Sequence, residues 1–188
     1  MPHIALGNDA SGIISLFAYR PETARPLSEL AEVLLRGPSS LSRGERELIA
    51  SYVSALNDCE FCTTSHAAFA AAQLPEGIAL VDQVRADLES APVPAKLKAL
   101  LRVAGAVQRS GRDVRPEDVA AARAEGATDV EVHDTVLIAA AFCMFNRYVD
   151  GLGTTLPDDT AEYAASADAI VSGGYLAILG RPEERAEA

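Results

Sequence analysis

Apolar residues recur at intervals of three and four along most of this sequence, which is the spacing of amphipathic helices. Between Thr23 and Leu35 this rhythm predicts a first helix, which the sequence Gly37-Pro38 stops. The same spacing predicts further helices over residues 77–88, 95–109, 115–125 and 129–145. No segment has a convincing strand pattern, so we expect an all-α fold.

A helical hairpin is predicted in the first half of the chain. Ser42 and Glu45 have the spacing of a capping box and open a helix whose apolar stripe continues to Leu56. Asn57 and the aspartate after it interrupt that pattern, and either can cap a second helix over residues 59–74. We therefore expect a helical bundle built around this hairpin.

The chain of 188 residues suits a single domain spanning residues 1–188. Residues 1–20 are predicted to form an N-terminal arm, in which Gly12–Tyr19 could be extended. Residues 181–188 have the composition of a frayed tail.

The segment after Asn146 predicts a broken helix, a loop over residues 153–159, and one more helix that ends before Gly173. A weak repeat aligns Asn57 with Asn146, since each follows an apolar helix and precedes another helical segment. The alignment raises the possibility of a duplicated hairpin in which only the first copy carries cysteines, although chance similarity between two amphipathic segments explains it equally well.

The composition narrows the choice of partners. Acidic residues number 27 against 16 basic ones, and the net charge of −11 is spread along the chain without a Lys/Arg cluster that could neutralise phosphates. We therefore expect no nucleic acid and no membrane as a partner. The sequence has no run long enough to span a bilayer and no signal peptide at its start, so the predicted location is the cytoplasm.

Two of the three cysteines, Cys59 and Cys62, form a CxxC pair, and His66 follows four residues later. In a reducing compartment such a pair indicates redox chemistry or metal binding, although an apolar helix can also carry cysteines without function. A zinc site needs four ligands, and the fourth would have to come from afar, from His133 or Cys143.

Helical spacing places Cys59, Cys62 and His66 on one face over about two turns. The start of a helix favours a thiolate, and a thiolate can attack a peroxide and then condense with a neighbouring thiol. Cys62, which is closer to His66, is the candidate for attack, and Cys59 would resolve the product. Glu47, twelve residues before Cys59, can fold back over the pair and assist proton transfer.

From Ser42 to Ala70 the sequence resembles the core motif of the alkylhydroperoxidase D and carboxymuconolactone decarboxylase superfamily, in its peroxidase-related branch. Glu47, Cys59, Cys62 and His66 each fall on a motif position. The resemblance implies a peroxidatic Cys62, a resolving Cys59, His66 as proton carrier and Glu47 as the acid that assists through water.

The same resemblance implies an alkylhydroperoxidase D-like all-α fold and an enzyme that acts on organic hydroperoxides or hydrogen peroxide without a cofactor. It also implies a homo-oligomer, commonly a trimer or hexamer, and reduction by a dithiol such as a lipoylated or thioredoxin-like protein. The sequence departs from alkylhydroperoxidase D at Phe61, where that protein has a second histidine. The shorter proton relay leaves open a redox sensor or binding protein that uses the same disulfide. A decarboxylase-like enzyme is a separate alternative, although a decarboxylase has no need of a vicinal dithiol.

Overall fold

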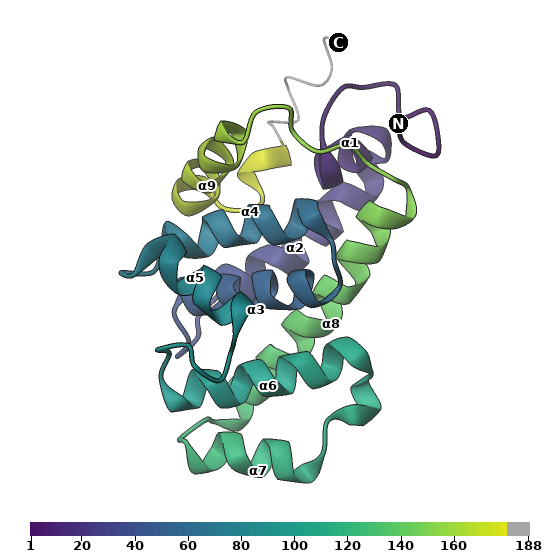
Figure 1. The fold of residues 1–188 in the computed structure, drawn as a ribbon. Coiled ribbons are helices and arrows are strands. Elements are labelled where there is room, and N and C mark those ends of the chain that lie inside the picture. Colours follow the sequence, from purple (N-terminus) through teal and green to yellow (C-terminus); the bar gives the residue numbers. More distant parts are fainter. Residues whose placement is uncertain (180–188) are drawn as a thin grey trace.

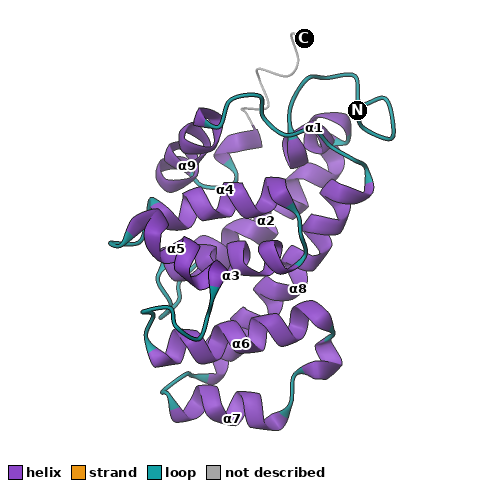
Figure 2. Cartoon of the chain, in the orientation of Figure 1, coloured by secondary structure: helices purple, strands orange, loops and turns teal. Residues whose placement is uncertain are grey.

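The computed structural model describes residues 1–179, and every regular element in that range is a helix (Figure 2). The α-helices are α1 (Gly12–Tyr19), α2 (Pro21–Arg36), α3 (Arg43–Leu56), α4 (Glu60–Ala71), α5 (Gly77–Ala86), α6 (Ala95–Arg109), α7 (Pro116–Ala124), α8 (Asp129–Gly151) and α9 (Ala161–Gly173). Two 3₁₀ turns lie at Gly111–Asp113 and Ala177–Leu179. The prediction of an all-α fold is confirmed, and the predicted tail at residues 181–188 lies outside the described range.

Helices α3 and α4 form the hairpin at the centre of the molecule (Figure 1). Ser42 and Glu45 make the predicted capping box at the start of α3. The turn after α3 is short because Asp58 adopts a left-handed conformation with φ of +56°, which aspartate tolerates better than most residues. Cys59 then occupies the N-cap position of α4, without a capping bond from its side chain, and α4 packs along α3.

The other helices enclose this hairpin. α3 packs against α6 and α8, while α4 packs against α5 and α9 on its other side (Figure 1). The fully buried side chains between these layers are mostly aliphatic, among them Leu48, Ile49, Val53, Leu100 and Ile138. In the part of the chain that the structure describes, no helix combines the length and apolarity that a bilayer crossing requires.

The segment Gly12–Tyr19 is a helix, so the expectation that it is extended is wrong. This short run is almost entirely apolar, and in such a run periodicity cannot distinguish a buried helix from a strand. Leu16 and Phe17 are buried, and α1 packs against α2 and α8. The N-terminal arm therefore contributes a helix to the packed structure.

The predicted break after Asn146 is also wrong, because α8 continues as one helix to Gly151. The side chain of Asn146 is buried, and it stays in the helix because its amide bonds to Ser54 and Asn57 on the central hairpin. With α8 unbroken, the segment around Asn146 does not form a second hairpin, and the proposed duplication is wrong as well.

Glu131 holds the start of α8 in place. Its carboxylate is 1% exposed, and it accepts hydrogen bonds from Lys96 Nζ at 2.7 Å, Ser40 Oγ at 2.9 Å and the backbone N–H of Thr128 at 2.7 Å. Burial opposes ionisation, but these three donors outweigh it and lower the pKa of Glu131 to about 2.

We expect Glu131→Gln to destabilise the protein at neutral pH, by on the order of 3 kcal/mol. A lowered native pKa stabilises the fold above the unfolded pKa of about 4.3, and this stabilisation is lost as the pH falls through 4 toward 2. Urea unfolding of both proteins from pH 7 to pH 2 measures the difference. A difference that does not shrink over this range would contradict the assignment.

Candidate active site

The CxxC pair lies at the turn of the central hairpin. Cys59 is the N-cap of α4 and Cys62 lies in its first turn, and both side chains are buried as free thiols. Val149 of α8 covers the pair, with Ile13 and Phe61 packed beside it. This environment excludes bulk water from the sulfur atoms while leaving them at the positive end of a helix.

The surroundings of the two thiols make them unequal acids. A hydrogen bond from Cys59 to Cys62 raises the pKa of Cys59, an effect that burial strengthens. The same bond lowers the pKa of Cys62, and the side chain of Asn146 lowers it further, against the opposing effects of burial and of Asp150. Cys62 is therefore the cysteine that ionises first, and Cys59 keeps its proton.

Glu47 and His66 face each other across the hairpin. Glu47 Oε2 is 2.7 Å from His66 Nδ1, and the carboxylate is 1% exposed. Its other oxygen, Oε1, accepts a hydrogen bond of 2.6 Å from the hydroxyl of Tyr175. Burial, followed by the neighbouring Glu47, raises the pKa of Tyr175 well above its ordinary value, so Tyr175 remains a donor at any working pH.

The imidazole of His66 is fixed by packing as well as by Glu47. Phe142 and Phe69 meet the ring edge-on, with centroids 4.5 Å and 5.0 Å away, and Tyr175 stacks at 6.4 Å. Since Nδ1 is occupied by the carboxylate, a neutral imidazole in this position carries its proton on Nδ1 and its lone pair on Nε2. The ring is thus oriented to exchange protons through Nε2.

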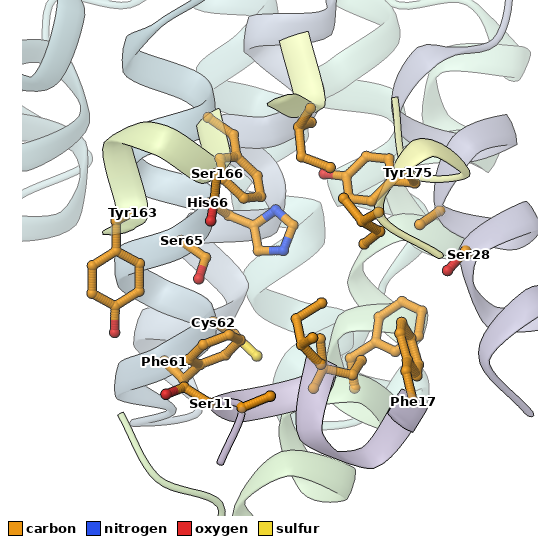
Figure 3. A pocket seen from close by; sticks show the side chains of 18 of the residues that line it. Ser11, Phe17, Ser28, Phe61, Cys62, Ser65, His66, Tyr163, Ser166 and Tyr175 are labelled. Atoms are coloured by element: carbon orange, nitrogen blue, oxygen red, sulfur yellow. The ribbon is translucent and has the colours of Figure 1, made fainter. Parts of the chain in front are cut away.

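Cys62 and His66 line the same cavity, which we call the Cys62 cavity (Figure 3). Its volume is about 270 Å³, and most of its wall is apolar. The wall is built by side chains from α1, α2, α4, α8 and α9, including Ile13, Phe17, Leu27, Phe61, Phe142, Phe145, Tyr163 and Ile170. A small organic molecule in this cavity would meet the thiol and the imidazole together.

Comparisons with known proteins agree with this geometry. The family model described as "Carboxymuconolactone decarboxylase family" matches residues 21–74, the segment that holds Glu47, both cysteines of the pair and His66. A solved structure from Ralstonia eutropha JMP134, titled as an alkylhydroperoxidase AhpD core and an uncharacterized peroxidase-related protein, superposes with a TM-score of 0.74 at 27% identity. That match covers 84% of this chain and 81% of the other.

An uncharacterized peroxidase-related protein from Silicibacter sp. TM1040 superposes with a TM-score of 0.73 at 26% identity, over 82% of this chain and 79% of that one. The chain is therefore similar to the alkylhydroperoxidase D and carboxymuconolactone decarboxylase superfamily, in the segment that the family model matches and in its fold. The two structures match its peroxidase-related branch. No curated protein matches the sequence.

Phe61 is the position at which this chain departs from alkylhydroperoxidase D. Its ring lines the Cys62 cavity and lies against the backbone of α1, where a Cβ atom on Gly12 would be 2.2 Å from Phe61 Cζ. Gly12 also has a φ of +54°, which a residue with a side chain rarely adopts. Phe61 therefore makes a wall of the cavity, with Tyr163 on its other side.

The zinc hypothesis named His133 and Cys143 as distant ligands, and neither reaches the cysteine pair. His133 is exposed near the start of α8, where it bonds to Asp134. Cys143 is partly buried beside Asn57. Within residues 1–179, no group of three or more His, Cys, Asp and Glu side chains is arranged to hold a metal ion.

Two residues of the site were missed by the sequence reasoning. Tyr175 lies 128 positions after Glu47, in a segment without periodicity that follows α9, and no local pattern connects the two. Asn146 was noted in the sequence only as the point of a predicted helix break and as part of the weak repeat, and its influence on Cys62 was not foreseen. A polar side chain inside a strongly apolar helix was the one available signal.

We expect Asn146→Ala to raise the pKa of Cys62, because the variant removes a hydrogen bond that favours the thiolate. Thiolate absorbance during a pH titration of the reduced protein measures this change. Gln108→Ala is the matched control, since Gln108 bonds to Asn57 one step farther from the cysteines. Equal titration curves for Asn146→Ala and the wild type would show that Asn146 has no influence on the thiol.

Proposed function

We propose that this protein is a thiol-dependent peroxidase that reduces organic hydroperoxides through Cys62 and Cys59. The observation that carries the proposal is the meeting, in one apolar cavity, of a thiol with a lowered pKa and a histidine held by a buried carboxylate. A vicinal dithiol has no purpose in a decarboxylation, and it is the natural pair for a peroxide that oxidises one cysteine at a time.

In the first step the thiolate of Cys62 attacks the distal oxygen of the hydroperoxide, and the O–O bond breaks. Cys62 becomes a sulfenic acid, and the departing alkoxide takes a proton from His66 Nε2 to leave as an alcohol. His66 carries the proton that Cys62 lost, and the carboxylate of Glu47 stabilises the imidazolium during the transfer. Hydrogen peroxide would react in the same way, with water as the leaving molecule.

In the second step the thiol of Cys59 condenses with the sulfenic acid of Cys62. The sulfur–sulfur bond forms, and the hydroxyl leaves with the Cys59 proton as water. A dithiol, such as that of a lipoylated or thioredoxin-like protein, would then reduce the disulfide by thiol–disulfide exchange. The cycle needs no metal, flavin or haem.

A redox sensor is the second candidate, and the burial of the pair favours it. Cys59 is 0% exposed and Cys62 is 4% exposed, which restricts the access of a large reductant to the disulfide. In a sensor the disulfide would change the assembly of the protein, for which we propose a trimer or hexamer of identical chains. Sedimentation of the reduced and oxidised forms separates the candidates, because only a sensor predicts different oligomers.

Stopped-flow mixing of the reduced protein with cumene hydroperoxide tests the peroxidase proposal. We expect rapid loss of two thiols per chain and formation of a Cys59–Cys62 disulfide, identified by mass spectrometry after alkylation. With excess dithiothreitol, each chain should consume many equivalents of the hydroperoxide. Oxidation no faster than that of free cysteine would overturn the proposal.

A further inference from the structure

Ser28 is a buried polar residue that the proposed chemistry does not use. It lies on α2, is 2% exposed, and lines the Cys62 cavity. Its hydroxyl has no hydrogen-bond partner within residues 1–179, a state that only two other buried side-chain oxygens share, those of Thr135 and Thr154. Neither of these lines the cavity, so Ser28 is the one of these three residues that does.

The position of Ser28 relative to the reacting groups is visible in Figure 3. Cys62, Ser65 and His66 come from α4 on one side of the cavity, and Ser28 lies across it, on the cavity side of α2. Apolar side chains, among them Phe17 and Leu27, line the cavity as well. A ligand that reacts at Cys62 can therefore place its far end against Ser28.

An unpaired buried hydroxyl is costly, at about 1–3 kcal/mol relative to a paired one. A serine within a helix usually avoids this cost by donating to a carbonyl three or four residues earlier, and Ser28 makes no such bond. A ligand oxygen at this point would remove the penalty. The hydroxyl can both donate and accept, so it suits an alcohol or a carbonyl.

The charges around the cavity exclude an anionic ligand. Among residues 1–179, no lysine or arginine lines it, and Glu162 is the one carboxylate in its wall. Glu47 lies buried behind His66 and adds a second negative charge nearby. A carboxylate brought into this apolar space would lose its hydration without gaining a lysine or arginine partner, and a protonated His66 is already paired with Glu47.

The volume sets the size of the ligand. A dry apolar cavity of about 150 Å³ accepts benzene, and the Cys62 cavity, at about 270 Å³, is nearly twice as large. An aromatic ring or compact alkyl body with one or two branches fits this space, whereas hydrogen peroxide would fill little of it.

We propose that the substrate is an uncharged organic hydroperoxide with a compact apolar body and a second oxygen, alcohol or carbonyl, that hydrogen-bonds to Ser28. Ser28 is thus a specificity-determining residue at the end of the cavity opposite Cys62. This inference rests on the proposed peroxidase function and adds the substrate class to it.

Four derivatives of one hydroperoxide test the proposal. Cumene hydroperoxide has no distal oxygen, its para and meta 2-hydroxypropan-2-yl derivatives add a neutral hydroxyl in two positions, and its para-carboxylate adds a charge. The second-order rate constant for oxidation of the reduced protein is measured with each. We expect at least one hydroxylated derivative to react about five- to tenfold faster than cumene hydroperoxide, and the carboxylate to react more slowly.

In Ser28→Ala the preference for the hydroxylated derivative over cumene hydroperoxide should fall to about one, while thermal stability holds or increases because an unsatisfied hydroxyl is removed. Ser172→Ala is the matched control, since that exposed serine on α9 lies outside the cavity, and the preference should persist in it. The inference is overturned if the wild type does not prefer a hydroxylated derivative over cumene hydroperoxide. It is also overturned if Ser28→Ala keeps that preference. If no derivative oxidises the protein faster than it oxidises free cysteine, the peroxidase proposal itself fails.

Discussion

Replacing Cys62 with serine is expected to lower the rate of reaction with organic hydroperoxides by more than about a thousandfold. A serine hydroxyl in this position cannot ionise at neutral pH, and the remaining thiol of the pair is a weak nucleophile because burial and the hydrogen bond to Cys62 raise the pKa of Cys59. Stopped-flow oxidation of the reduced variant measures the loss. In the wild type the rate should rise with pH and level off below about 8.5, the ordinary pKa of a thiol, because the pKa of Cys62 is lowered.

Two further cysteine variants make this prediction specific. Cys59→Ser should still undergo the first oxidation and then stop as a sulfenic acid, which dimedone traps for mass spectrometry. Cys143→Ala should turn over like the wild type, since Cys143 lies outside the Cys62 cavity. Fast oxidation of Cys62→Ser together with slow oxidation of Cys59→Ser would show that the roles of the two cysteines are reversed.

The second large effect is expected for Glu47→Gln, whose rate with hydroperoxide should fall by about a hundredfold. The amide keeps the size of the side chain and can still accept the hydrogen bond from Tyr175, but it carries no charge to stabilise a protonated His66. The loss should be larger for cumene hydroperoxide than for an acidic peroxide such as a peracid, because a good leaving group needs less help from a proton donor. The ratio of these two rates is the measurement.

Two controls separate the charge of Glu47 from its structural role. Glu45→Gln, on the same helix, removes a capping carboxylate that faces away from the cavity, and we expect its rates to match the wild type once folding is confirmed. Tyr175→Phe keeps the aromatic packing but removes one hydrogen bond to Glu47, with an expected loss of about tenfold or less. A Glu47→Gln variant with an unchanged ratio of rates would remove Glu47 from proton transfer.

Local patterns were sufficient to predict most of the helices. α6, at Ala95–Arg109, has the predicted bounds, and the capping box of Ser42 fixed the start of α3. Gly12–Tyr19 could not be assigned because its apolar residues leave no polar face, and its helical form depends on packing against α2 and α8. Asn146 suggested a break because the bonds that satisfy it come from residues about 90 positions earlier.

In the site as well, contacts within one hairpin could be predicted from the sequence, whereas contacts between distant segments could not. Glu47 and His66 were predictable as a pair because both lie on one hairpin, where helical spacing decides which side chains can face each other. Tyr175, which holds the other oxygen of Glu47, comes from beyond α9, and its contact depends on how α9 packs against α4. The sequence identified Phe61 only as a departure from alkylhydroperoxidase D, and its contact with Gly12 could not be predicted because that contact depends on the helical form of α1.

The hydrogen bond between Tyr175 and Glu47 gives the protein an optical signal of its own. An excited phenol passes its proton readily to a carboxylate that it already contacts, so the fluorescence of Tyr175 is quenched in the paired state. The chain has five tyrosines and no tryptophan, so no indole emission masks a change in one of them. The emission of the unlabelled protein should therefore brighten in any state or variant in which the carboxylate of Glu47 no longer accepts this hydrogen bond.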